Sequence, residues 1–196
     1  NGARIFQKRF HTPIYANHGT SEAIKSLVDH NELKIQIFQT GSSFNIGNLS
    51  IESFLIPHDA FEPVGFKVTN GVKYIGVATD LGIITETIVD KFKECQLIVV
   101  EANYDEDLLS EAPRPWRLKQ RIRSRKGHLS NIDTAKLIIE CGQKYLKDVI
   151  ICHLSSECNS KATALKTINS QLKLEGLKNI NIEVSTADHP SKIWIG

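Results

Sequence analysis

The chain has 196 residues, of which 41% are hydrophobic and 23% are charged, and its 24 Lys and Arg residues nearly balance its 22 Asp and Glu residues. This length and apolar fraction suit one large domain or a pair of small domains with a buried core. The net charge of +2 does not by itself indicate a nucleic-acid partner. No run approaches the roughly 20 apolar residues that span a bilayer, and no signal peptide opens the chain, so we expect no membrane partner.

The cysteines form no CxxC pair, and this spacing suits reduced thiols better than a disulfide framework. They are Cys95, Cys141, Cys152 and Cys158. We therefore expect a cytoplasmic protein.

Short apolar runs rich in β-branched and aromatic residues predict β-strands along most of the chain. The expected strands are 34–38, 49–56, 64–69, 72–79, 96–101, 148–152 and 181–185. Between two of them, Asn70 and Gly71 predict a two-residue hairpin, because both central positions of such a turn favour positive φ.

Helical spacing of apolar residues predicts helices at 85–94, 131–146 and 161–175. Ser130 or Asn131 is a suitable N-cap for the middle helix. Because strands and a hairpin precede an alternation of strands and helices, the chain predicts one domain over residues 1–196, an α/β layered sandwich with a mixed sheet.

Several predicted strands end on a side chain that can bind a metal, namely His58, Asp80, Glu101 and His153. Strands that stop at the same edge of a sheet bring such side chains together. Imidazole and carboxylate groups are ligands for borderline and hard divalent metals, so the pattern favours a metal site. The alternative is that each residue separately caps a turn.

His128 differs from these residues because it follows a basic run and precedes a predicted helix start. This location suits a residue that transfers a proton. The alternative is a partly exposed histidine that only begins a helix.

The basic run "RPWRLKQRIRSRKG" predicts contact with phosphate, because guanidinium groups bind phosphate bidentately and tryptophan stacks on a base or sugar. The candidate phosphate contacts are Arg114, Trp116, Arg117, Lys119, Arg121, Arg123 and Arg125, with Lys126 in the same run. The alternative is an ordinary solvated charged face.

Six segments, in this order, resemble the metallo-β-lactamase-fold hydrolases, and among them the WalJ (YycJ) group of exonucleases: "PHDAFEPVGF", "ATDLG", "VVEANYD", "RPWRLKQRI", "GHLSN" and "CHLS". The resemblance implies an αβ/βα sandwich with mixed sheets, of which residues 1–196 form the C-terminal two thirds or more of a single domain. It also implies two divalent metal ions, zinc or manganese, at the edge between the β-layers. Position by position, it implies that His58 and His153 are metal ligands and that Asp80 bridges both ions. It also implies that His128 protonates the leaving oxygen, as in phosphodiesterases such as tRNase Z, and that Glu101 orients His128.

Two departures from the family pattern are evident. Tyr104 stands where the family commonly has a histidine. The HxHxDH motif, which supplies most of the family's ligands, is absent from the chain, and by its spacing to Pro13 we expect it just upstream of Asn1 in a longer protein. The alternative is that this first metal-binding half of the family's domain has been lost. Without it, three ligands are too few to hold two ions with open positions.

The sequence therefore predicts a metal-dependent phosphodiesterase, a nuclease acting on DNA. A hydrolase of thioesters, lactams or small phosphodiesters is the first alternative, since one fold supports many functions. The second is a metal-free module that binds nucleic acid or a partner protein without catalysis. The remaining histidines are expected to be surface or turn residues rather than ligands: His11, His18, His30 and His189.

Overall fold

The structure is a computed structural model that describes residues 2–27, 33–186 and 191–195. Its helices are α1 (Gly2–Phe10), α2 (His18–Leu27), α3 (Glu86–Phe92), α4 (Glu106–Glu111), α5 (Trp116–Ile122), α6 (Asn131–Cys141) and α7 (Lys161–Leu174). Its strands are β1 (Ile14–Asn17), β2 (Ile35–Phe38), β3 (Ser43–Ile46), β4 (Leu49–Leu55), β5 (Val64–Thr69), β6 (Tyr74–Ala78), β7 (Leu97–Glu101), β8 (Asp148–Cys152) and β9 (Asn181–Val184).

Within the described residues, strands β3 to β9 form one sheet in chain order. Neighbouring strands are antiparallel from β3 to β6 and parallel from β6 to β9. The polarity changes where helices begin to connect the strands, because parallel neighbours require a crossover whereas a hairpin makes an antiparallel pair. The expected mixed sheet is therefore confirmed.

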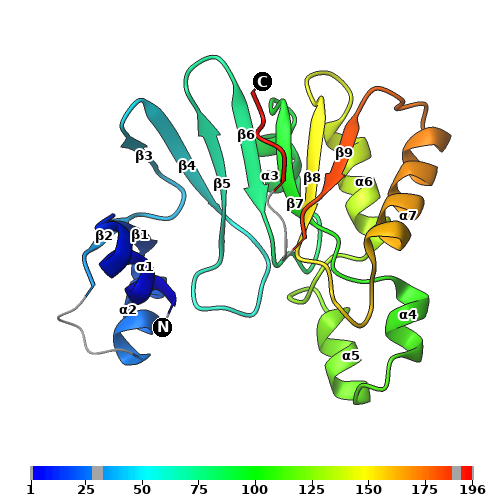
Figure 1. Cartoon of the computed structure of the whole chain (residues 1–196), viewed down its shortest axis with the longest axis horizontal. Helices are drawn as coiled ribbons and strands as arrows, with labels where there is room; N and C mark the ends of the chain where they lie inside the picture. Colours follow the sequence, from blue (N-terminus) through cyan, green and yellow to red (C-terminus); the bar gives the residue numbers. More distant parts are fainter. Residues whose placement is uncertain (1, 28–32, 187–190, 196) are drawn as a thin grey trace.

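Helices α3, α6 and α7 cover one face of this sheet (Figure 1). The main core lies between them, where Ile98 and Ile151 of the sheet and Phe92 and Ile138 of the helices are fully buried. Burial of each such side chain contributes roughly 1.5–3 kcal/mol, so this interface carries much of the stability of the fold.

The opposite face of the sheet contacts a small parallel sheet of β1 and β2 through aromatic rings. Phe38 of β2 stacks on Phe44 at 4.9 Å and meets the edge of Phe66 at 5.8 Å, and Tyr15 of β1 stacks on Phe44 at 5.3 Å. Phe66 pairs with Val77 in the face opposite the α3–α6–α7 layer. With α1 and α2 beside the small sheet (Figure 1), the layers have the α/β sandwich order that the sequence predicts.

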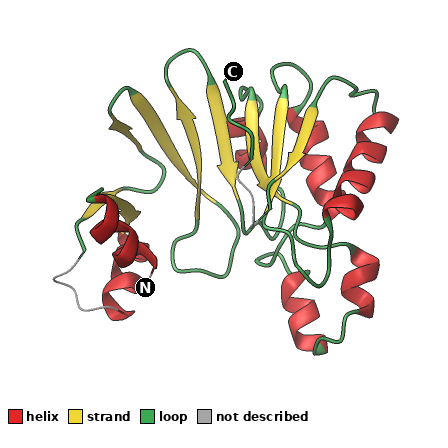
Figure 2. Cartoon of the chain, viewed as in Figure 1, coloured by secondary structure: helices red, strands yellow, loops and turns green. Residues whose placement is uncertain are grey.

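Helices α4 and α5 form an arm, residues 106–122, that lies beyond the carboxyl ends of the parallel strands (Figure 2). A second, small core joins the arm to the neighbouring loops; it is made of Leu109, Ala112 and Ile122 of the arm with Tyr104 and Cys158. The arm therefore lies next to the carboxyl ends of the parallel strands of the large sheet.

The expected strands match β2 and β4 to β9, but the Asn70–Gly71 turn is longer than predicted. Thr69 pairs with Tyr74, so the loop has four residues, and Gly71 alone of them has positive φ, 88°. The Asn70 side chain accepts hydrogen bonds from the Val72 and Lys73 amides at 3.0 and 2.9 Å. This side-chain turn replaces the two-residue turn.

The middle predicted helix has the expected N-cap, since the Ser130 hydroxyl accepts from the Asp133 amide at 3.1 Å. It ends at Cys141, before Gly142, rather than at 146. Elements that the patterns did not predict are short or polar, namely α1, α2, α4, α5, β1 and β3. None of the described helices combines the length and apolar character needed to cross a bilayer.

Candidate metal centre

Strands β4, β6, β7 and β8 run in the same direction, because β4 and β6 are both antiparallel to β5 and β6 to β8 are parallel. Their carboxyl ends lie at one edge of the sheet, where open α/β sheets place their sites. His58 follows β4, Asp80 follows β6 and His153 follows β8, while Glu101 is the last residue of β7. The topology thus gathers side chains that are up to 95 positions apart in the chain.

Asp80 lies at the centre of this group. Its Oδ1 atom is 3.8 Å from His58 Nε2, 3.7 Å from His128 Nδ1 and 3.6 Å from His153 Nδ1. These distances exceed ordinary hydrogen-bond lengths. The carboxylate is therefore surrounded by three imidazoles without being hydrogen-bonded to any of them.

Glu101 is fully buried and holds two of these imidazoles. Its Oε2 atom lies 3.0 Å from Nδ1 of His128 and 3.0 Å from Nδ1 of His153. Its Oε1 atom accepts hydrogen bonds from the backbone amides of Leu81 and Leu129. Because an ionised carboxylate only accepts hydrogen bonds, both Nδ1 atoms must donate.

The third imidazole is held in the same way by a backbone group. His58 Nδ1 lies 3.2 Å from the Gly127 carbonyl oxygen and donates to it. In His128 and His153, Nδ1 is therefore occupied and Nε2 remains for a metal ion or a substrate. His58 Nε2 lies 3.4 Å from Asp59 Oδ1 and 3.8 Å from Asp80 Oδ1. Support of one ring nitrogen is the usual way in which proteins orient metal-binding histidines.

The Glu101 carboxylate and the His153 imidazole that binds it shift each other's pKa values. Burial raises the pKa of Glu101, but hydrogen bonds from His128 and His153 outweigh it, so the pKa lies below the ordinary carboxyl value. The hydrogen bond to Glu101 raises the pKa of His153, burial lowers it, and the nearby Asp80 adds to the increase. An ionised Glu101 thus balances positive charge on the imidazole side of the site.

The backbone at this edge is constrained. Asp80 and His153 have positive φ, 61° and 53°, a conformation that is uncommon outside glycine and is often found at functional sites. The Asn103 side chain donates to the His153 carbonyl at 2.9 Å, and the Asn103 carbonyl accepts from the Ser155 amide at 2.8 Å. Sequence reasoning missed the role of Asn103, although it lies in the quoted segment "VVEANYD".

The predicted site residues Asp80, Glu101, His128 and His153 therefore come together, while His58 lies beside this group, with Nε2 3.8 Å from Asp80 Oδ1. Among the described residues, one ligand atom from each of Asp80, Glu101, His128 and His153 lies within 4.8 Å of the others. Imidazole and carboxylate donors fit a divalent zinc or manganese ion. Both Glu101 oxygens are already hydrogen-bonded, which favours support rather than coordination for this residue.

The basic run forms the second half of the arm and the loop that leads to His128. Arg114, Arg121 and Arg123 make ion pairs with acids, and Lys119 donates to the Ser110 carbonyl at 2.6 Å. Trp116, Arg117 and Arg125 are exposed, as is Arg121, but Arg117 and Arg125 form no ion pair within the described part of the chain.

Tyr104, which replaces a family histidine, is 3% exposed in the small core that joins the arm to the neighbouring loops, and burial raises the pKa of its phenol. It is not a member of the metal-binding group. His11 and His18 are exposed, as predicted, while His30 and His189 lie outside the described residues.

Comparison with known proteins agrees with this arrangement. A family model described as a beta-lactamase superfamily domain matches residues 2–153. The exodeoxyribonuclease YycJ of Bacillus anthracis is 29% identical over 177 residues, which cover 89% of this chain and 67% of that protein. The exodeoxyribonuclease WalJ of Streptococcus pneumoniae is 32% identical over 175 residues, which cover 88% of this chain and 65% of that protein. The chain thus spans about two thirds of the length of these curated relatives.

Among solved structures, the metallo-beta-lactamase fold protein YhfI from Bacillus subtilis superimposes with a TM-score of 0.66 at 15% identity, covering 89% of this chain and 62% of that one. At this identity the likeness is one of fold. The family model covers most of the chain and the layers of the structure agree with it. The chain therefore belongs to the beta-lactamase superfamily, with the metallo-β-lactamase fold.

Proposed function

We propose that the protein is a metal-dependent hydrolase that cleaves phosphodiester bonds in nucleic acid, specifically DNA, and that residues 1–196 act as one domain. The observation that carries the proposal is the set of three imidazoles around the Asp80 carboxylate, each with its Nδ1 atom held by a hydrogen bond. Such a set suits binding of a cation beside a proton donor.

His58, Asp80 and His153 would hold the metal, zinc or manganese. A divalent ion bound there would lower the pKa of a bound water molecule and neutralise negative charge on the phosphoryl oxygens. We propose two ions, as the family resemblance implies. Three ligands are too few for two ions with open positions, so the second ion requires donors beyond these residues.

His128 would act as the proton donor to the leaving oxygen. Its Nδ1 atom is held by Glu101 at 3.0 Å, which fixes the ring orientation. Its Nε2 atom then carries the proton that is transferred. Proton donation by a positioned side chain contributes on the order of 10²–10⁴ in rate.

The nucleic-acid substrate is supported by the relatives named exodeoxyribonuclease and by the basic loop that leads to His128. DNA is the substrate that those names print. The four cysteines are free thiols, which supports a reducing compartment, the cytoplasm.

The test measures metal content and the degradation of labelled DNA with added manganese or zinc. We expect Asp80→Asn to lose bound metal and activity together, whereas His128→Ala keeps its metal and loses about 10²–10⁴ in turnover. DNA degradation that is unaffected by chelation would contradict the proposal. Strong hydrolysis of a small chromogenic phosphodiester with no DNA cleavage would favour the small-substrate alternative.

A further inference from the structure

We propose that the basic run of the arm contains two sets of residues with different functions. Arg114, Lys119, Arg121 and Arg123 hold the arm in place, and a second set, Trp116, Arg117, Arg125 and Lys126, binds the sugar-phosphate backbone of nucleic acid. We call the second set the contact surface. The choice of nucleic acid as its ligand rests on the proposed function, whereas the division into two sets rests on contacts in the structure.

Two arginines of the first set fasten the arm to the loops that carry metal-site residues. Arg121 binds Asp59 bidentately, with Nε 2.6 Å from Oδ2 and Nη2 3.1 Å from Oδ1. Asp59 adjoins His58 in the chain. Arg114 Nε donates to Glu157 Oε2 at 2.8 Å, and Glu157 lies four residues after His153. The arm is thus attached on both sides of the candidate metal centre.

The other two cations connect α4 with the segment that carries α5. Arg123 donates from Nε to Glu106 Oε2 at 2.9 Å and from Nη2 to the Ser110 hydroxyl at 2.7 Å. Lys119 donates to the Ser110 carbonyl at 2.6 Å. A cation whose donors are directed to such acceptors has fewer left for a phosphate.

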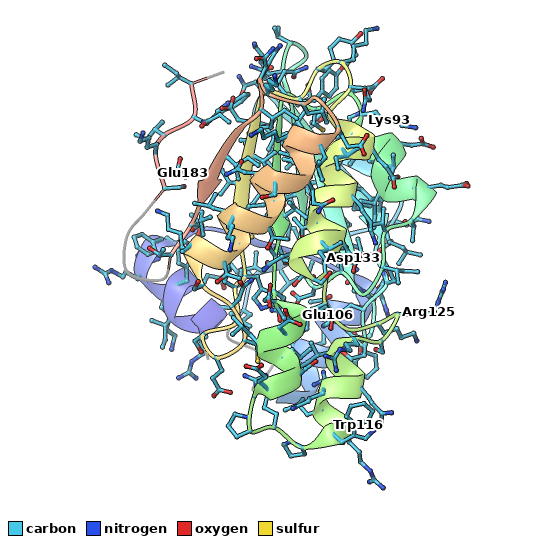
Figure 3. The ribbon with its side chains drawn as sticks, turned by 90° about the vertical axis from the view of Figure 1, so that its right-hand side faces the viewer. Lys93, Glu106, Trp116, Arg125, Asp133 and Glu183 are labelled. Carbon is cyan, nitrogen blue, oxygen red and sulfur yellow. The ribbon has the colours of Figure 1, made fainter. Side chains whose placement is uncertain are left out.

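The cationic side chains of the contact surface differ from those of the first set in their partners. Within the described ranges, Arg117, Arg125 and Lys126 are exposed and form no ion pair. The Trp116 side chain is 65% exposed. In Figure 3, Arg125 projects away from the ribbon and Trp116 lies at the free end of the arm. An uncommitted guanidinium binds phosphate bidentately, and an exposed indole offers its face to a base or sugar.

The contact surface begins beside the metal centre. A Cβ atom on Gly82, two residues after Asp80, would lie 2.3 Å from the Arg125 carbonyl carbon, so the backbones at these two positions are in close contact. Gly127, next to Lys126, accepts the hydrogen bond from His58. Trp116 is the first residue of α5, at the end of the helix farther from Gly127. A helix of this length is about 10 Å long at 1.5 Å per residue. A strand with one phosphate at the metal centre can therefore continue past Arg125 and along the arm.

A pair of charge-matched variants tests the division. The test variant Arg117→Gln/Arg125→Gln/Lys126→Gln and the control Arg114→Gln/Lys119→Gln/Arg123→Gln each remove three positive charges. Binding to phosphorothioate DNA of about 20 nucleotides, single-stranded or duplex, is measured against salt concentration, because each phosphate contact contributes about 0.7–0.9 to the slope of log affinity against log salt. Melting temperature is recorded for both variants.

We expect the test variant to keep the wild-type melting temperature. Its slope of log affinity against log salt should be smaller in magnitude by about 2 to 3. We expect the control to melt at a lower temperature and to keep the wild-type slope. An equal loss of slope in both variants, or no loss in the test variant, would overturn the inference. Trp116→Ala should weaken single-strand binding by about tenfold and leave duplex binding unchanged; no loss on single strands removes Trp116 from the surface.

The same proteins are assayed for metal-dependent hydrolysis of a small chromogenic phosphodiester, which needs no extended backbone contact. If wild type hydrolyses both this ester and labelled DNA in a metal-dependent way but the test variant keeps its salt slope, the contact surface is wrong and the proposed function stands. If the two variants show the expected slopes but wild type shows no metal-dependent hydrolysis of DNA or of the ester, the proposed function is wrong and the contact surface stands.

Discussion

Glu101 and His128 are 27 positions apart in the chain, yet Glu101 Oε2 lies 3.0 Å from His128 Nδ1 in a site where the carboxylate is fully buried. A buried carboxylate is costly unless its hydrogen bonds are complete. Two backbone amides and two imidazoles meet this requirement here. The contact therefore orients His128 and also stabilises the strand end at which the metal centre forms.

Glu101→Gln should lower both activity and metal affinity. A neutral amide cannot accept hydrogen bonds from both imidazoles and two backbone amides with the strength of a carboxylate, and loss of such a supporting partner typically costs 10–100-fold in metal affinity or activity. Metal titration and DNA degradation measure the two effects. Glu175→Gln, at an exposed position, is the control and should match wild type. Full metal affinity in the Glu101 variant would show that the histidines orient themselves without it.

Asn103→Ala should loosen the loop that carries His153. The variant removes the donor to the His153 carbonyl and leaves that acceptor without its partner, at a cost of about 1–3 kcal/mol. Chemical denaturation measures the loss of unfolding free energy, and metal titration measures the weaker site. An unchanged free energy of unfolding with unchanged metal affinity would mean that the other backbone contacts suffice.

Gly127→Ala should displace the loop between the arm and His128. Its new Cβ atom would lie 2.1 Å from the Ile122 carbonyl oxygen and 2.3 Å from the Arg121 carbonyl oxygen, so the backbone must shift. We expect a loss of about 1–3 kcal/mol in stability and reduced activity, because Gly127 also accepts the bond from His58. Gly2→Ala, where a Cβ meets nothing within 4 Å, is the control. Equal melting temperatures for the two variants would contradict the expected clash.

Burial raises the pKa of both the Cys95 and the Cys141 thiols from 9.0 to about 12. At pH 8 they should react with a thiol reagent roughly 10³-fold more slowly than an exposed cysteine, because the thiolate is the nucleophile. Unfolded protein in denaturant is the control and should react at all four cysteines. Rapid reaction of every thiol in the native protein would contradict the buried placement.

The same raised pKa values determine the sign of the alkaline stability change. Below pH 9 both states keep these protons, so the contribution to stability is fully present. Between pH 9 and about 12 the unfolded state releases protons that the folded state retains, so the free energy of unfolding should fall as pH rises through this range. Denaturant titrations at pH 8 and above pH 9 measure it.

The sequence by itself determined strands β4 to β9 of the large sheet, though not β3, and the residues at the ends of these strands, because alternating apolar patterns and the side chains that interrupt them are local features. It also indicated the N-cap Ser130, since capping depends on neighbours within one turn. The hairpin loop at Asn70 was predicted to have two residues, whereas it has four. The Asn70 side chain stabilises this longer loop, which backbone preferences do not reveal.

Only the tertiary structure decided which distant groups share a partner. Glu101 supports His153 as well as His128, and Gly127 supports His58, because the common direction of four strands brings their ends to one edge. It also divided the basic run, since an arginine's function depends on whether an acid lies within reach, and Asp59 and Glu157 reach Arg121 and Arg114 only after the chain has folded. Residue type is written in the sequence, whereas a hydrogen bond or an ion pair between remote residues requires a distance that folding alone creates.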